Sequence, residues 1–126
     1  MQMKSILLIE DDPFLSEMYV KKIQEAGFSI INVPTAEEAL RQLAEQLPDL
    51  ILLDIVLPKM DGFEFLRHIA DEAKYAKVPI VVLSNVGQKD EIQRAIDLGA
   101  KGYIVKAQFT PSEIIQKIRQ ILLAQT

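Results

Sequence analysis

The stretch Leu50-Ile51-Leu52-Leu53-Asp54 decides the fold, because four apolar side chains run directly into a carboxylate. A short, continuous apolar run predicts a β-strand that is buried on both faces. Pro48 precedes the run, and residues 57–62, Leu-Pro-Lys-Met-Asp-Gly, follow it with turn-forming composition. Asp54 is therefore expected at the tip of a buried strand, where a carboxylate is costly unless its neighbours favour negative charge.

Similar apolar runs predict strands at residues 6–9, 80–83 and 102–105, and the more polar stretch 28–33 predicts a strand nearer an edge. The segments between the strands predict helices, since they combine start signals with apolar residues at helical spacing. The inward faces of these helices are expected to include Leu47, Ala73 and Ile96.

Strands that alternate with helices indicate an α/β fold, in which helices cover both faces of a parallel sheet. We predict five parallel strands in the order 2-1-3-4-5, doubly wound as in flavodoxin-like folds, with five helices. The chain has 126 residues and no linker or low-complexity segment, so a single domain is expected over residues 1–126.

The composition argues against several classes of function. A net charge of −4 is unlike that of a nucleic-acid binder with a basic surface. The absence of cysteine excludes disulfides, thiolate metal sites and cysteine catalysis. No apolar run is long enough for a signal sequence or a membrane span, so we expect a cytoplasmic protein without a membrane partner.

Polar residues follow four of the predicted strands where each one ends: Asp11 and Asp12, then Asp54, Ser84 and Lys106. The carboxyl ends of parallel strands share one edge of the sheet, and sites form there where the strand order reverses. Asp11 and Asp12 are therefore expected to face Asp54 across a crevice between the first and third strands.

Three carboxylates so close together repel one another unless a cation separates them. Ligation by oxygen alone favours Mg²⁺ over zinc. We predict direct ligation by the carboxylates of Asp12 and Asp54 and by the backbone carbonyl of Val56, with Asp11 acting through water.

Lys106 and Ser84 complete a candidate site for phosphoryl transfer. Lys106 and the metal would neutralise phosphoryl oxygens, and the hydroxyl of Ser84 would donate to another, while Asp54 attacks in line.

These residues resemble the receiver domain of two-component response regulators, including the stand-alone chemotaxis type. The resemblance extends from Ile6 to Leu122 and depends on several motifs that occur in order, each near a strand tip. The motifs are Ile9-Glu10-Asp11-Asp12, Leu53-Asp54, residues 57–62, Leu83-Ser84 and Tyr103-Ile104-Val105-Lys106.

The resemblance implies that Asp54 takes a phosphoryl group from a phosphohistidine on a sensor histidine kinase or a histidine phosphotransferase. Asp11 and Asp12 would hold Mg²⁺, and Lys106 would pair with the phosphate. Such a chain is a self-phosphorylating and self-dephosphorylating switch, and we expect no turnover substrate.

The resemblance also implies how the switch is read. Ser84 would move toward the phosphate, and Tyr103 would turn inward to fill the space that Ser84 leaves. The surface of the fourth helix, fifth strand and fifth helix would be remade for an output partner, either a separate protein or a C-terminal output domain. Apart from the resemblance, our hypothesis is that a phosphorylation-dependent homodimer forms through a face of mixed charge made by Asp90, Asp97, Lys101 and Arg119.

Two positions depart from the family pattern. Ala107 follows Lys106, where the family usually has proline with a cis bond. A non-proline cis bond costs about 3 kcal/mol, so this peptide is either trans with a reshaped loop or strained. Asn85 follows Ser84, where a small residue is usual, and it either crowds phosphate access or supplies a donor.

Two other functions stay open. One is a receiver-like interaction module that is never phosphorylated, which Ala107 and Asn85 leave possible. The other is a Mg²⁺-dependent phosphatase with an aspartate nucleophile, of the haloacid-dehalogenase type. That chemistry needs a second acid two residues after Asp54, where this chain has Val56.

Overall fold

Five parallel strands form one sheet in the computed structural model, which describes residues 3–124. The order β2-β1-β3-β4-β5 confirms the predicted topology. The strands are β1 (Ser5–Ile9), β2 (Ser29–Val33), β3 (Leu50–Leu53), β4 (Ile80–Ser84) and β5 (Gly102–Val105).

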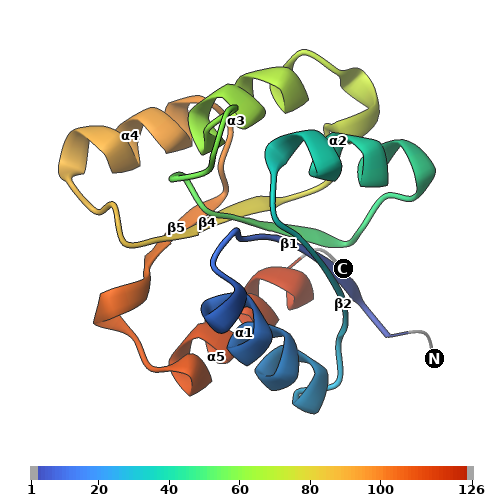
Figure 1. Cartoon of the computed structure of the whole chain (residues 1–126), viewed down its shortest axis with the longest axis vertical. Helices are drawn as coiled ribbons and strands as arrows, with labels where there is room; N and C mark the ends of the chain where they lie inside the picture. The colour runs from blue at the N-terminus through green and yellow to red at the C-terminus, as the bar shows by residue number, and fades with distance from the viewer. Residues whose placement is uncertain (1–2, 125–126) are drawn as a thin grey trace.

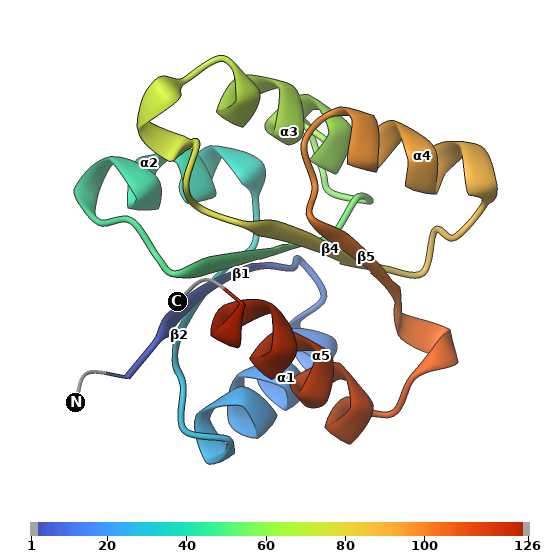
Figure 2. The ribbon, with the colours of Figure 1, turned by 180° about the vertical axis from the view of Figure 1, so that it is seen from behind.

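Helices cover both faces of this sheet, as expected for a doubly wound fold. In Figures 1 and 2, α1 and α5 lie together on one face, and α2, α3 and α4 lie on the other. The helices are α1 (Pro13–Glu25), α2 (Ala36–Glu45), α3 (Gly62–Ala70), α4 (Lys89–Asp97) and α5 (Pro111–Leu123). Two single turns of 3-10 helix, η1 (Ala73–Tyr75) and η2 (Lys106–Gln108), precede β4 and α5.

Side-chain caps mark where α1, α2, α3 and α5 begin. The side chains of Asp12 and Thr35 accept N–H groups in the first turns of α1 and α2. Asp61 and Thr110 form complete capping boxes at α3 and α5 with the glutamate three residues on. Each cap satisfies N–H groups that a helix leaves without internal partners, so the loops that enter these helices are held in place.

The central strands are buried on both sides, and alternate residues enter two separate cores. Leu7 and Ile9 of β1 pack with the helices on the α2–α4 face, whereas Ile6 and Leu8 pack with α1 and α5. All four residues of β3 are buried. The edge strand β2 instead alternates between exposed and covered residues, in agreement with its more polar sequence.

Three residues that we expected to face the core do not. Leu47 is 46% exposed and lies beyond the end of α2, and Ala73 is exposed beyond the end of α3, so the helical spacing no longer applies to either. Ile96 is 40% exposed, since α4 buries only Ala95 fully. Among residues 3–124, no helix is long and apolar enough to cross a membrane.

Candidate functional site

The polar residues that follow the strands meet in one open hollow at the carboxyl edge of the sheet. It lies at the crevice between β1 and β3, where the strand order reverses. The lining includes the side chains of Glu10, Asp11, Asp12, Asp54, Val56, Ser84, Asn85, Val86 and Lys106.

An acidic cluster forms the floor of this hollow. Glu10, Asp11 and Asp54 each place a carboxylate oxygen within 4.8 Å of the other two. Glu10 and Asp54 are buried, whereas Asp11 is exposed to the hollow. An all-oxygen donor set with one open side is what Mg²⁺ prefers, because this ion keeps several of its waters. The residues present therefore fit a magnesium ion.

Lys106 lies against this cluster and offsets its charge. Its Nζ lies 3.1 Å from Oδ2 of Asp54 and also donates to Oε1 of Glu10. Burial alone would lower the pKa of Lys106, but the Glu10 hydrogen bond and the charges of Asp54 and Glu10 outweigh it and raise this pKa. Burial raises the pKa of Glu10, and Lys106 opposes that shift. The lysine is therefore held as a cation beside Asp54.

The structure places Asp12 differently from our prediction of a direct metal ligand. Its Oδ1 accepts the N–H groups of Phe14 at 2.9 Å and Leu15 at 3.1 Å, as the N-cap of α1. Asp12 is outside the acidic cluster, and Glu10 takes the place that we had given it. The order Asp12-Pro13 predicts a helix cap, and we expected Asp12 to cap α1 as well as to bind the metal; the structure shows the cap.

Asp54 is fixed by backbone contacts on both sides. Its N–H donates to the carbonyl of Ile9 at 3.1 Å, which continues the ladder between β1 and β3. Its Oδ1 accepts the N–H of Val56 at 3.1 Å, while Oδ2 faces Lys106. The ligand role of the Val56 carbonyl stays a prediction, and Val56 as a residue is 62% exposed.

Gly62 allows the loop after Asp54 to close tightly. A Cβ at this position would lie 2.7 Å from the carbonyl oxygen of Asp54 and 2.7 Å from Cα of Ile55. The N–H of Gly62 donates to the Ile55 carbonyl at 2.9 Å. The start of α3 is thereby packed against the backbone of the candidate phosphoacceptor.

Ser84 and Tyr103 lie on neighbouring strands and share one loop. Ser84 is fully buried, and its Oγ accepts the N–H of Val86 at 3.3 Å. The half-buried Tyr103 donates its hydroxyl to the carbonyl of Val86. Burial raises the pKa of Tyr103 to about 12, with smaller contributions from the charges of Glu91 and Asp54. Both side chains therefore bind the loop between β4 and α4.

The loops after β4 and β5 are also joined to each other. Oδ1 of Asn85 accepts the N–H of Ala107 at 3.1 Å. No cis peptide bond occurs within residues 3–124, so the Lys106–Ala107 peptide is trans and the loop is reshaped into η2. Of the two alternatives that the sequence left open, a trans peptide with a reshaped loop or a strained cis peptide, the structure shows the first.

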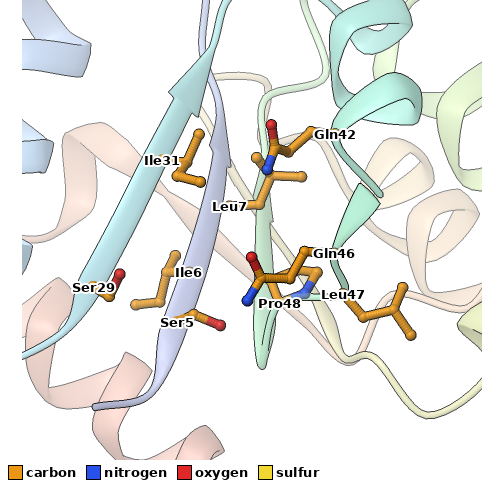
Figure 3. A pocket seen from close by; sticks show the side chains of 9 residues that line it. All are labelled: Ser5, Ile6, Leu7, Ser29, Ile31, Gln42, Gln46, Leu47 and Pro48. Atoms are coloured by element: carbon orange, nitrogen blue, oxygen red, sulfur yellow. The ribbon is translucent and has the colours of Figure 1, made fainter. Parts of the chain in front are cut away.

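A second hollow lies away from this site and lacks its chemistry. It is formed by β1, β2 and the segment around the end of α2, as Figure 3 shows. Its lining is Ser5, Ile6, Leu7, Ser29, Ile31, Gln42, Gln46, Leu47 and Pro48, none of which carries a charge.

The fold and the site together define a flavodoxin-like α/β domain with an acid–lysine site at its switch point. Residues 6–119 match the family model of the response regulator receiver domain. The chain belongs to the response regulator receiver domain family, which confirms the resemblance that the sequence motifs indicated.

Named relatives and solved structures agree with this assignment. The chain is 33% identical over 119 residues to the phosphate regulon transcriptional regulatory protein PhoB of Escherichia coli, covering 94% of this chain and 52% of PhoB. It is 33% identical to the DNA-binding dual master transcriptional regulator RpaA of Synechocystis, covering 95% of this chain and 49% of RpaA. The chain therefore spans about half the length of these curated relatives.

Among solved structures, chemotaxis protein CheY4 of Vibrio cholerae matches with a TM-score of 0.87 and 26% identity, over 94% of this chain and 98% of that one. The BeF3-activated receiver domain of RstA from Klebsiella pneumoniae matches with a TM-score of 0.86 and 27% identity, over 94% and 98% of the two chains. Receiver domains are signalling switches, so the chain belongs to a class of switches.

Proposed function

We propose that this chain is a phosphoacceptor switch in which Asp54 takes a phosphoryl group from a phosphohistidine on a histidine kinase or phosphotransferase. The observation that carries the proposal is the placement of Asp54, between an acidic cluster that fits a divalent cation and the ammonium of Lys106. A carboxylate so placed is a nucleophile with charge-neutralising groups on two sides.

In the proposed reaction, one oxygen of Asp54 attacks phosphorus from the side opposite the donor. The new bond joins that oxygen to phosphorus, the bond to the donor breaks, and its electron pair leaves with the donor. The ammonium of Lys106 moves from the carboxylate to a phosphoryl oxygen, because the carboxylate loses its negative charge. Mg²⁺, when bound, neutralises charge on the phosphoryl oxygens.

Glu10, Asp11 and Asp54 are the side chains that we assign to the metal, with the Val56 carbonyl as the further ligand predicted from sequence. Glu10 also holds Lys106, so its contribution to the ion is expected to pass through water. The capping bonds of Asp12 leave it a role at the start of α1.

The output half of the proposal concerns Ser84 and Tyr103. Movement of Ser84 toward a phosphate would break its bond with the Val86 N–H, and the bond from Tyr103 to the Val86 carbonyl would be remade in the same step. The loop that leads into α4 is then the element that changes state, and the surface of α4, β5 and α5 is the output face.

The partners belong to the proposal too. A sensor kinase or histidine phosphotransferase supplies the phosphoryl group, and an output protein or C-terminal output domain reads the α4, β5 and α5 surface. Single-domain organisation over residues 1–126 and a cytoplasmic location stay predictions. The homodimer also stays a prediction. Two residues of its proposed face are already hydrogen-bonded within the chain: Asp97 to Gln93 at 2.8 Å, and Arg119 to the Ala26 carbonyl at 2.9 Å.

The test is a mass measurement after incubation with acetyl phosphate and Mg²⁺. We expect one phosphoryl group on the wild-type chain and none on Asp54→Asn, which keeps the shape of the side chain but loses the nucleophile. Asp90→Asn, an exposed aspartate in the first turn of α4, is the matched control and is expected to behave as wild type. An unmodified wild-type chain would favour the unphosphorylated interaction module, and turnover of a small phosphomonoester would favour the phosphatase.

A further inference from the structure

One hydrogen bond joins the segment that follows Ser84 to η2, which begins at Lys106. It runs from the N–H of Ala107 to Oδ1 of Asn85 at 3.1 Å. The register of β4 and β5 pairs Ser84 with Val105, so this bond lies beyond the last paired residues of the two strands. The side chain of Asn85 thus extends the connection between β4 and β5 past the end of the sheet.

The bond satisfies a backbone N–H group in η2. A short helical turn leaves its first N–H groups without internal partners, and Val105 at the start of η2 offers no side-chain cap. The closing bond of the turn itself, from the Phe109 N–H to the Lys106 carbonyl, is long at 3.4 Å. Asn85 therefore supplies an acceptor that the turn does not contain.

Alanine at position 107 makes the arrangement possible. Proline has no N–H to donate, and it disfavours helical backbone at the residue before it. Here Lys106 is the first residue of η2. The two departures from the family pattern, Asn85 and Ala107, are therefore acceptor and donor of the same hydrogen bond.

We infer that Asn85 is a positioning residue that acts through the Ala107 N–H to hold Lys106 against Asp54 and Glu10. The ammonium group lies at the end of the long, flexible lysine side chain, and fixing that side chain in one conformation costs conformational entropy. Its reach to Asp54 and Glu10 depends on where the backbone of η2 is held, and Ala107 and Gln108 are themselves exposed. The effect on phosphorylation rests on the proposed function, whereas the bond and its effect on η2 do not.

The first experiment measures hydrogen exchange of the Ala107 amide in the unphosphorylated protein. Asn85→Ala is expected to speed this exchange roughly two- to tenfold, which corresponds to the loss of one ordinary hydrogen bond. Gln88→Ala is the matched control, because Gln88 is an exposed amide in the same loop without a side-chain cap bond. Unchanged exchange in Asn85→Ala would overturn the inference.

The second experiment is a double-mutant cycle on the rate of phosphorylation by acetyl phosphate. Asn85→Ala is expected to slow the wild-type chain roughly two- to tenfold, and to have no effect in an Ala107→Pro background, which has no N–H to lose. Equal slowing in both backgrounds would show that Asn85 does not act through Ala107.

A measurement of Mg²⁺ affinity distinguishes a loss of Lys106 positioning from general damage to the site. Asn85 is not part of the acidic cluster, so Asn85→Ala is expected to slow phosphorylation without weakening Mg²⁺ binding. Weaker binding together with the slower rate would contradict a role through Lys106. If the wild-type chain takes up no phosphoryl group at all, the proposed function fails, and the exchange experiment still decides whether Asn85 holds the backbone of η2.

Discussion

Nζ of Lys106 lies 3.1 Å from Oδ2 of Asp54, although 52 residues separate the two in sequence. The same ammonium donates to Glu10, so one buried cation serves two buried carboxylates. This contact explains how the acids that follow β1 and β3 can share one edge of the sheet, since each buried carboxylate would be costly there without a partner.

Replacing Lys106 with methionine is expected to destabilise the protein by about 3 kcal/mol, the usual result of leaving a buried charge without its partner. Mg²⁺ should restore part of the loss by binding the folded state alone. Urea denaturation with and without Mg²⁺ measures both effects. Lys106→Arg keeps the charge and should lose less; unchanged stability in Lys106→Met would contradict the shared ion pair.

Substitutions at Asp11 and Asp12 are expected to distinguish a metal ligand from a helix cap. Asp11→Ser should weaken Mg²⁺ binding at least about tenfold and leave stability almost unchanged, because Asp11 is exposed. Asp12→Ala should cost about 1 kcal/mol of stability and leave Mg²⁺ affinity largely intact. Asp12→Ser, which can still cap α1, should match wild type in both. If Asp12→Ser loses as much affinity as Asp11→Ser, Asp12 is a ligand after all.

Gly62→Ala tests the close packing behind Asp54. The new Cβ would meet backbone atoms at 2.7 Å, so we expect a loss of about 2 kcal/mol in stability and slower phosphorylation, because the Asp54 backbone must shift. The control is Gly27→Ala, at φ +97° with no atom within 4 Å of the added Cβ. It should lose stability through backbone strain yet phosphorylate at the wild-type rate.

The Tyr103 hydroxyl is expected to lose its proton only at high pH. The free energy of unfolding should therefore change with pH in the alkaline range. The fold raises the pKa of Tyr103 from 10.0 to about 12, so it favours the neutral phenol. This contribution to stability is complete below pH 10.0 and is lost as the pH rises through about 12. The raised pKa of Lys106 acts in the same direction.

The measurement is the tyrosinate absorbance of wild type minus that of Tyr103→Phe across alkaline pH. The difference should have its midpoint near 12. Tyr19 also has a pKa raised by burial, but it is present in both proteins and cancels. A midpoint at the ordinary value of 10.0 would show that the Tyr103 hydroxyl is not held in the half-buried position described here.

The sequence by itself determined the sheet and most of the site. Continuous apolar runs such as Leu50–Leu53 have one stable environment, the middle of a covered parallel sheet, and alternation with helices then fixes the direction of every strand. Once the directions are known, the residues after the strands must share one edge. The sequence therefore predicts that Asp11, Asp54, Ser84 and Lys106 lie together, and all four line the same hollow.

Only the tertiary structure decided which side chain of the acidic run faces the crevice. Glu10, Asp11 and Asp12 are consecutive acids, and local sequence leaves open how the chain turns between β1 and α1. The turn buries Glu10 against Lys106, 96 residues away in sequence, and directs Asp12 to cap α1. The bond between Asn85 and Ala107 likewise spans 22 residues. Such contacts depend on how close two segments that are far apart in sequence come to each other in the folded chain. A pattern of neighbouring residues carries no information about that spatial distance.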